Sequence, residues 1–319
     1  MERAEKSPSE SPAKNAAGKA MKQEIKTNSA RAWILAARPK TLAAAAAPVA
    51  IACALAYSDG AFRPEPAFLC MLFALIMQVD ANFINDLFDC LKGSDGEGRL
   101  GPDRACAKGW ITTGAMRLGI AAATAAACLA GLGLLRYGGA WLAGVGAACV
   151  LFAFLYTAGP KPLAYCAMGD ALVFVFFGLV PVCCTYYVTA GGMTLAAAVS
   201  AAACGLAVDT LLALNNYRDL RQDAKNGKRT LTVLLGERGG IALYLWLGAA
   251  AWAATLPLAA LGKPYAPLLA CIYLFFHIRA WKTMREIGSG RALNRVLAMT
   301  SRNILIFAAA LSAGFALGR

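Results

Sequence analysis

The sequence predicts an all-α membrane protein with nine transmembrane helices and helical cytoplasmic cap loops after the second and sixth. Hydrophobic residues make up 59% of the chain and charged residues only 15%, against about 25% charged residues in soluble domains. The apolar residues are gathered in long runs, and a helix that spans a bilayer needs about 20 of them. Such runs cover 33–57, 66–88, 115–135, 139–158, 169–189, 193–216, 239–260, 265–281 and 301–318.

The first 30 residues differ from the rest of the chain. Residues 1–30 are rich in Ser, Pro, Lys and Glu and show no apolar periodicity, a composition typical of disorder. They contain no apolar core of the kind that a signal peptide needs. We therefore expect a disordered cytoplasmic tail at 1–30 and a single intramembrane domain at 31–319.

The net charge of +13 raises the question of nucleic-acid binding, but the distribution of the charge indicates membrane topology instead. With a cytoplasmic N-terminus and nine alternating spans, all Lys and Arg residues except Arg63, Arg136, Lys263 and Arg319 belong to cytoplasmic segments. This asymmetry follows the positive-inside rule. We expect an integral plasma (inner) membrane protein in contact with lipid, with its N-terminus and active-site loops in the cytoplasm and no nucleic-acid partner.

The eleven cysteines and the single histidine do not indicate a metal site. Most of the cysteines lie inside apolar runs, where cysteine behaves as a small hydrophobic residue. The chain has no CxxC pair, so we expect neither disulfides nor a cysteine–metal centre. His277 follows two phenylalanines near the end of the 265–281 run, and we expect it to pack rather than to catalyse.

Two of the predicted helices end in clusters of acidic and amide side chains. The first cluster, in NFINDLFDCLKGSD, contains Asn82, Asn85, Asp86, Asp89 and Asp95. The second, in NNYRDLRQDAKNGKRT, contains Asn215, Asn216, Asp219 and Asp223. A carboxylate at membrane depth costs about 2.5–3.5 kcal/mol at a helix centre, so two such clusters indicate a function.

A basic, polar loop follows each cluster, and together they form a weak internal repeat. The loops read KGSDGEGRLGPDRACAKG and RQDAKNGKRTLTVLLG. Both are too polar to enter the bilayer and too short to form a separate domain, so we expect each to fold as a short helical cap over the acidic ends. Paired elements of this kind usually form two facing halves of one cavity in membrane proteins.

The spacing within each cluster predicts a column of oxygen ligands. Asn82, Asp86 and Asp89 are four and three residues apart, and Asp219 and Asp223 are four apart, so the members of each set share one helix face. Oxygen ligands suit Mg²⁺, which is usually bound by one or two carboxylates together with substrate phosphates.

The signs of the charges indicate the substrate class. Carboxylates repel a diphosphate, since two like unit charges 4 Å apart cost about 4 kcal/mol at an effective dielectric of 20. Metal ions must therefore intervene, and two Mg²⁺ ions would bridge the clusters to a diphosphate and stabilise it as a leaving group. The basic residues available to neutralise the remaining charge are Lys92, Arg104, Lys108, Arg218, Lys228 and Arg229.

Ionisation of an allylic diphosphate leaves a carbocation, and aromatic faces stabilise cations. Tyr156, Tyr217, Phe83 and Phe88 lie near the predicted cytoplasmic helix ends. A site embedded in the membrane also gives a long isoprenoid chain an apolar place to lie.

Simpler structural explanations exist for several of these residues. An Asp at a membrane boundary is often interfacial, and Asp80, Asp170 and Asp209 are candidate partners of buried polar groups. Lys161, the only charge in its loop, is explained by topology or by contact with diphosphate. A cation-coupled transporter is the alternative from another class, but transporters place their acids near the bilayer midplane, whereas these acids lie at one face beside basic loops.

The paired boxes resemble those of the UbiA superfamily of intramembrane prenyltransferases, and several stretches are similar to its menaquinone branch, the 1,4-dihydroxy-2-naphthoate polyprenyltransferases. These stretches are ARPKTL (37–42), NFINDLFDCLKGSD (82–95), GPDRA (101–105), YTAGPKPLAY (156–165), GDALVFVFFG (169–178) and NNYRDLRQDAKNGKRTLTVLLG (215–236). They run from the first predicted helix into the seventh, so the resemblance covers most of the chain after the tail.

The resemblance implies nine helices around a central cavity and Mg²⁺-dependent transfer of a polyprenyl group from its diphosphate to an aromatic acceptor. In the menaquinone branch that acceptor is 1,4-dihydroxy-2-naphthoate, and its carboxylate is lost as carbon dioxide. The product would be demethylmenaquinone. The alternative acceptors in the same fold are 4-hydroxybenzoate, homogentisate and a tetrapyrrole.

The resemblance also assigns roles to individual residues. By motif position it implies a metal–diphosphate site at Asn85, Asp89, Asp219 and Asp223, with Asp86 and Asp95 as supplements. The substrate-binding residues that we expect are Lys92, Arg104, Tyr156, Lys161, Tyr217, Lys228 and Arg229, together with Arg38 and Lys40. Arg38 and Lys40 lie on the RPKT stretch, and the resemblance implies that they meet either the diphosphate or the carboxylate of the acceptor. Asn215 and Asn216 complete the set of predicted metal ligands.

Overall fold

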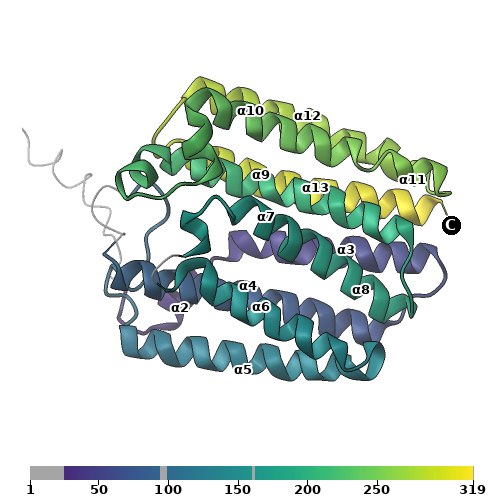
Figure 1. Ribbon diagram of the computed structural model, residues 1–319, viewed down its shortest axis with the longest axis horizontal. Helices are drawn as coiled ribbons and strands as arrows, with labels where there is room; N and C mark the ends of the chain where they lie inside the picture. Colours follow the sequence, from purple (N-terminus) through teal and green to yellow (C-terminus); the bar gives the residue numbers. More distant parts are fainter. Residues whose placement is uncertain (1–24, 94–98, 160–161, 319) are drawn as a thin grey trace, which may run out of the picture.

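The computed structural model describes residues 25–93, 99–159 and 162–318. These residues form an all-helical bundle without a β-strand, as predicted (Figure 1). Most of the predicted tail, and the site residues Asp95 and Lys161, lie outside the described residues.

The helices follow the predicted apolar runs closely. The first five elements are α2 (Ala30–Ala37), the 3₁₀ helix η1 (Pro39–Thr41), α3 (Leu42–Ser58), α4 (Pro64–Leu91) and α5 (Thr113–Gly138). Next come α6 (Trp141–Thr157), η2 (Leu163–Tyr165), α7 (Gly169–Phe174), η3 (Val175–Leu179) and α8 (Val180–Ala190). The last five are α9 (Leu195–Lys225), α10 (Leu231–Ala253), α11 (Pro257–Ala260), α12 (Tyr265–Ile287) and α13 (Leu293–Leu317).

Seven stretches in the described part of the chain are helical, long and apolar enough to cross a membrane, which makes this an integral membrane protein. They are Ala30–Ser58, Pro64–Leu91, Thr113–Gly138, Gly169–Ala190, Leu195–Lys225, Leu231–Ala260 and Leu293–Leu317. Two of the nine predicted spans are not among them. Helix α6 has 17 residues, which gives a length of about 25 Å, and α12 carries Arg279, Lys282 and Arg285 in its second half.

The two predicted cap loops differ from each other. After α9 a short loop is followed by helix again at Leu231, capped by the Thr230 hydroxyl, which accepts the N–H of Val233 at 3.2 Å. Gly236 then adopts φ 71° and separates residues 231–235 from the long part of α10. After α4 the described residues 99–112 form hydrogen-bonded turns rather than a helix.

Close approach between helices depends on glycine in the middle of the bundle. The fifth predicted span is interrupted by η3, a single π-helical turn between α7 and α8. Its Gly178 lies against α9, where an added Cβ would be 2.5 Å from the Cα of Gly205. Single π turns inside α-helices are frequent at functional sites, and this one brings Phe176 and Phe177 to the cavity described below.

The end of the bundle beyond α3 and α8 is held by one polar cluster. The Lys263 Nζ lies 2.7 Å from Asp59 Oδ1 and donates to the Ser58 hydroxyl at 2.7 Å. The Tyr186 hydroxyl donates to the other Asp59 oxygen at 2.6 Å. This cluster ties α3, α8 and the loop before α12 together.

His277 packs inside the second half of the bundle. Its ring stacks between Tyr244 and Tyr273, with ring centroids 4.8 and 5.4 Å away, and is buried. The ring also lies so close to Gly248 that an added Cβ would be 2.2 Å from Nε2. The eleven cysteines are all free thiols.

Candidate active site

The ends of α4 and α9 meet around one aromatic ring. We call this region, residues 82–93 and 215–230 with Tyr165, the acidic end of the bundle. Two ammonium groups lie over the Tyr165 ring, with the Lys92 Nζ 5.5 Å and the Lys228 Nζ 5.1 Å from its centroid. Lys92 follows α4 and Lys228 follows α9, so the ring connects the two clusters that the sequence placed far apart.

At the end of α4, two carboxylates contact the loop that follows. Asp89 forms an ion pair with Arg104 at 2.5 Å, and both side chains are buried, with 12% and 8% of their surfaces exposed. The two oxygens of Asp86 accept the backbone N–H groups of Ala105 at 2.9 Å and Cys106 at 2.8 Å. Asp86 therefore holds this loop in place, and its assignment as a metal ligand stays a prediction.

The two asparagines of the first cluster face different neighbours. The Asn82 amide donates to the Ala37 carbonyl and to the Thr41 hydroxyl, both at 2.9 Å, and so holds the corner between α2 and η1. Asn85 lies one turn nearer to Asp89 and accepts a hydrogen bond from the Thr157 hydroxyl. Lys92 donates to the Thr157 carbonyl at 2.5 Å. Thr157 thus connects the end of α6 to the acidic end.

At the end of α9, the carboxylates pair with cations that are close in the sequence. Arg218 donates to both oxygens of Asp219 at 2.9 and 2.5 Å and to Asn294 at 2.8 Å. The Lys228 Nζ lies 3.3 Å from Asp223. The Asn294 amide also donates to the Leu100 carbonyl at 2.8 Å, so the loop after α4 reaches the second cluster.

The two asparagines of the second cluster take no part in the ion pairs at this helix end. The Asn215 amide donates to the Leu211 carbonyl of its own helix at 3.0 Å, and Asn216 is half-buried beside it. Tyr217, expected near the substrate, is buried and points the other way, because its hydroxyl donates to the Gly288 carbonyl at 2.7 Å.

The two lysines at Tyr165 respond differently to their surroundings. Burial disfavours the charged form of Lys228, but the carboxylates of Asp223 and Asp89 outweigh it and raise the pKa of this lysine. Burial lowers the pKa of Lys92, and repulsion from Lys228 acts in the same direction, against a smaller opposing effect of Asp89. The charged form of Lys228 is therefore stabilised by one carboxylate from each cluster.

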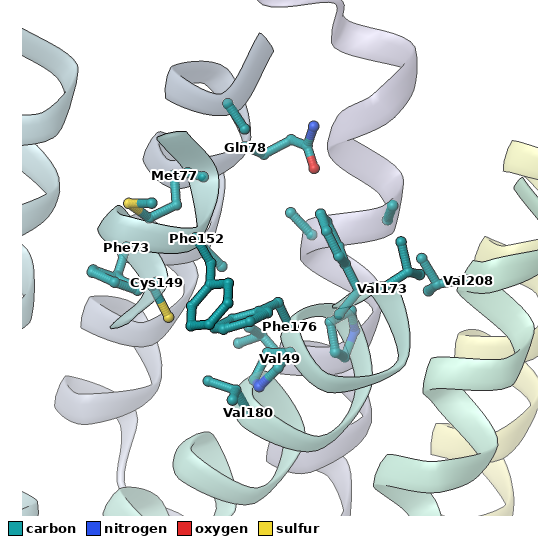
Figure 2. Close-up of a pocket in the computed structure, with 18 of the residues that line it drawn as sticks. Val49, Phe73, Met77, Gln78, Cys149, Phe152, Val173, Phe176, Val180 and Val208 are labelled. Carbon is teal, nitrogen blue, oxygen red and sulfur yellow. The ribbon is translucent and has the colours of Figure 1, made fainter. Parts of the chain in front are cut away.

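A cavity of about 360 Å³ runs into the bundle between α3, α4, α6, α7, α8 and α9. Its wall is mostly apolar, and Figure 2 shows Phe152 and Phe176 side by side within it, with ring centroids 5.1 Å apart. Asn82 and Asn85 of the first acidic cluster and Asn215 of the second also line it. An apolar space therefore adjoins the acidic end, as a long isoprenoid chain requires.

The predicted substrate residues fall into two groups. Arg38 and Tyr156 line the cavity, and Lys92, Arg104 and Lys228 lie at the acidic end. The side chains of Lys40 and Arg229 are exposed and do not line the cavity, although the Arg229 N–H donates to the Tyr165 carbonyl at 3.1 Å.

The isolated acids have partners of different kinds. Asp80 is fully buried and accepts the Thr124 hydroxyl at 2.7 Å, which agrees with a structural role. Asp80, Asp170 and Asp209 each keep one buried carboxylate oxygen, Oδ1, without a hydrogen-bond partner among the described residues.

Three residues that contribute to this geometry were not predicted individually. Tyr165 is the last residue of the YTAGPKPLAY stretch, and Thr157 is its second, so the resemblance pointed to their segment but not to their contacts. Asn294, at the start of α13, lies outside every resembling stretch. No sequence signal connects it to Arg218, because the contact forms only when α13 packs beside α9.

The acidic end has the donor chemistry for Mg²⁺ without a ready-made carboxylate cage. The described residues contain no group of three His, Cys, Asp or Glu side chains placed to hold a metal ion. The buried carboxylates of Asp89 and Asp223 do hold cations, namely the Arg104 guanidinium and the Lys228 ammonium. Mg²⁺ usually needs only one or two carboxylates, with water and substrate phosphates completing its shell, so these residues fit such an ion.

Comparison with known proteins assigns the family. The profile of the UbiA prenyltransferase family matches residues 45–304, which is most of the chain. The chain belongs to the UbiA prenyltransferase family. The resemblance noted in the sequence is thereby confirmed, and the protein is an intramembrane prenyltransferase by family.

Relatives and a solved structure extend this result. The UbiA-family chain is 38% identical over 213 residues to a 1,4-dihydroxy-2-naphthoate octaprenyltransferase of Escherichia coli, covering 65% of this chain and 69% of the relative. It is 34% identical to an enzyme of the same name from Mycobacterium tuberculosis, covering 90% of this chain and 97% of the relative. The structure of a UbiA homolog from Archaeoglobus fulgidus bound to GPP and Mg²⁺ shares the fold, with a TM-score of 0.63, 14% identity and coverage of 89% and 99%.

Proposed function

We propose that this UbiA-family protein transfers a polyprenyl group from polyprenyl diphosphate to 1,4-dihydroxy-2-naphthoate, giving demethylmenaquinone in its reduced, hydroquinone form in menaquinone biosynthesis. The observation that carries the proposal is the meeting of two acidic clusters around Tyr165, beside an apolar cavity that a residue of each cluster lines. The names of relatives that are 34% and 38% identical to this chain support the choice of acceptor.

We place the acidic end at the cytoplasmic face of the inner membrane. The distribution of Lys and Arg along the sequence supports this orientation, because with alternating spans almost all of them belong to segments assigned to the same side as the loops after α4 and α9. In this proposal α6 and α12 also span the bilayer, which gives nine spans in residues 31–319. Snorkelling of Arg279, Lys282 and Arg285 to the interface would let α12 do so.

We assign the diphosphate site to the facing ends of α4 and α9. Asn85 and Asp89 on one side, and Asp219 and Asp223 on the other, would hold Mg²⁺, most simply two ions, with Asn215 and Asn216 as supplementary oxygen donors. When bound, Mg²⁺ neutralises the diphosphate and stabilises it as a leaving group. Arg104 and Lys228 now lie within 3.3 Å of the carboxylates of Asp89 and Asp223. When Mg²⁺ takes their place at these carboxylates, the two cations would bind the diphosphate oxygens instead.

Different residues of the chain would act at different steps of the reaction. The allylic C–O bond breaks and its electron pair leaves with the diphosphate, to which Lys92 and Lys228 donate hydrogen bonds. The face of Tyr156, which lines the cavity, stabilises the prenyl cation, and the apolar cavity excludes water from it. The electron-rich acceptor ring then forms the new C–C bond, and the carboxylate leaves as carbon dioxide, which returns the electrons of the broken C–C bond to the ring.

The direct test is an acceptor panel. Purified protein is incubated with Mg²⁺, a labelled polyprenyl diphosphate and, separately, 1,4-dihydroxy-2-naphthoate, 4-hydroxybenzoate, homogentisate and a tetrapyrrole. We expect prenylated product and diphosphate release with the naphthoate alone. Product with a different acceptor would move the protein to another branch of the family, and no diphosphate release with any acceptor would contradict the enzymatic proposal.

A further inference from the structure

The outward faces of α12 and α13 are basic. Between Tyr265 and Leu317 the sequence has six Lys and Arg residues, and Glu286 is its only acid. The side chains of Arg279 on α12 and of Arg295 and Arg302 on α13 are exposed. Within the described part of the chain, none of these three arginines forms an ion pair. Helix α12 lies at the edge of the bundle opposite α5 (Figure 1), where the protein meets lipid.

The three arginines gather where α12 and α13 touch. The Asn303 amide donates to the Phe276 carbonyl at 3.1 Å, and the Arg302 guanidinium lies 5.5 Å from the centroid of the Phe276 ring. Arg279 is three residues after Phe276, and Arg295 is seven residues before Arg302, so each shares a helix face with a residue of this contact. We call Arg279, Arg295, Arg302 and Phe276 the arginine strip.

The arginine strip reaches below the membrane surface. The Tyr217 hydroxyl donates to the Gly288 carbonyl just after α12, so the strip lies at the same end of the bundle as the acidic end. Leu317, which is exposed, is fifteen residues after Arg302, a rise of about 22 Å along α13. The hydrocarbon core of a bilayer is about 30 Å thick. With Leu317 at the far boundary of this core, the backbone of Arg302 lies inside the hydrocarbon layer.

A cation at this depth requires an anion or water. A charged side chain within the hydrocarbon is costly, and the long arginine side chain lowers that cost by reaching up to the headgroups. The Arg302 guanidinium is also positioned, because it lies over the Phe276 ring and its Nη2 is 3.5 Å from Asn303 Oδ1. The anion that a bilayer offers at this level is a lipid phosphate, which a guanidinium binds through two parallel N–H groups.

The surface next to the arginine strip suits acyl chains. Phe275 of α12 and Leu305 of α13 lie one residue and three residues deeper than the Phe276–Arg302 contact, and their side chains are 65% and 46% exposed. The outward face of the two helices therefore changes from cationic to apolar along the membrane normal. This order matches a phospholipid, whose phosphate lies above its chains.

We propose that the arginine strip binds the phosphate of an anionic phospholipid, with Arg302 and Arg279 as the ligands. The site goes beyond the proposed function and depends on it only for the choice of leaflet, which is the cytoplasmic one. Basic sites between transmembrane helices on that side are suited to anionic headgroups. Arg285 provides a matched control, because it is equally exposed on α12 but lies about 120° around the helix from Arg279, over the Trp281 ring at 4.7 Å.

The first experiment measures lipid preference. Wild-type protein, R302Q, R279Q and R285Q in neutral detergent are titrated with phosphatidylglycerol or phosphatidylcholine carrying the same oleoyl chains, and native mass spectrometry gives the Kd of the first bound lipid. We expect wild type to bind phosphatidylglycerol at least about tenfold more tightly, as one charge-assisted pair provides. R302Q and R279Q should lose most of this preference and R285Q should keep it.

Two results of this titration would overturn the proposal. Equal Kd values for the two lipids in wild type would show that the strip selects no anion. A loss of preference in R285Q as large as in R302Q would show that general surface charge attracts the lipid. If R302Q failed to fold, R279Q would test the same site from the other helix.

The other possible occupants of the strip are a soluble phosphate and a second copy of the chain. Glycerol 1-phosphate in large molar excess should not displace phosphatidylglycerol, and displacement would contradict a lipid site. Light scattering should give the same mass for wild type and R302Q in phosphatidylcholine micelles. A lower mass in R302Q would make the strip a subunit interface and overturn the proposal.

Stability and turnover complete the test. Phosphatidylglycerol should raise the Tm of wild type more than that of R302Q, because a ligand stabilises the state that binds it, whereas the two Tm values should agree in phosphatidylcholine. Equal gains in Tm from phosphatidylglycerol would count against the site. Prenyl transfer in phosphatidylcholine should be the same in wild type and R302Q, since the arginine strip lies outside the cavity and the acidic end. Failure of the lipid site and failure of the proposed function are therefore distinguishable.

Discussion

The two acidic helix ends have matching sequences and different surroundings. At the end of α4 the partners of Asp86 and Asp89 come from residues 104–106, which are 15 to 20 positions further along the chain. At the end of α9, Asp219 pairs with the adjacent Arg218, and Asp223 pairs with Lys228 in the next loop. The second half of the site is therefore built locally, whereas the first half depends on a long loop folding back.

This difference predicts that substitutions in the two halves of the site have different structural effects. A change at the α9 end removes a side chain and leaves the surrounding backbone intact. A change at the α4 end also releases the loop that carries Arg104, which contacts Asn294 of α13 and Arg291 just before α13. The predictions below test that asymmetry, beginning with the largest expected effect.

The largest loss of activity is expected for Asp89 and Asp219, the two aspartates that occupy the same place in the two clusters. D89A and D219A should each lower kcat/KM by at least about 100-fold, the scale on which loss of a key electrostatic partner of a transition state acts. The measurement is prenyl transfer at saturating Mg²⁺, with membrane insertion checked by detergent extraction and size-exclusion chromatography. Near-wild-type turnover in both variants would contradict a site shared between the two helices.

Substitution of Asp86 should affect the loop at the α4 end of the site, whereas the matching substitution at the α9 end should not. D86A removes the acceptor of two backbone N–H groups, and hydrogen bonds to a charged group contribute about 1.5–3 kcal/mol each. We expect faster limited proteolysis within residues 99–112 and about a tenfold loss of activity. N216A, at the same level of the other cluster, is the control and should leave proteolysis of that loop unchanged. Loss of activity in D86A with an unchanged proteolysis rate would instead support Asp86 as a metal ligand.

Tyr165 tests the contact between the halves. The ring holds two ammonium groups, each cation–π contact contributing about 0.5–2 kcal/mol, so Y165L should raise the KM of polyprenyl diphosphate several-fold. Y165F keeps the ring and should behave like wild type. If Y165F were as impaired as Y165L, the hydroxyl rather than the ring face would be the functional group.

The smallest expected effect is a pH dependence from the two lysines. The pKa of Lys92 is lowered and that of Lys228 is raised, so on alkalinisation Lys92 loses its proton first. Lys228 stays charged, and its ion pair with Asp223 persists until the pH rises through its raised pKa. The KM of polyprenyl diphosphate should therefore increase on the alkaline side, K92R should remove that increase, and K228R should not. An identical profile in wild type and K92R would exclude Lys92 as the titrating group.

Hydropathy predicted the positions of the helices better than their ends. The run 66–88 became α4, Pro64–Leu91, and the run 193–216 became α9, which continues to Lys225. The extra turns of α9 contain Asp219 and Asp223, polar residues that a search for apolar runs excludes. Helix α10 likewise begins at Leu231 rather than at 239, because Thr230 caps a short helical segment that Gly236 then interrupts.

The sequence by itself determined the membrane character, the all-helical class, the two acidic clusters and the family, since each depends on composition, periodicity or short motifs. Only the tertiary structure decided which side chains meet. Two lysines lie over the Tyr165 ring, Asn82 holds the corner between α2 and η1, Tyr217 points away from the cavity, and Asn294 reaches Arg218. Spacing along one helix fixes which residues share a face, but the partners of that face come from segments up to 76 residues away, and only the packing of the helices brings them together.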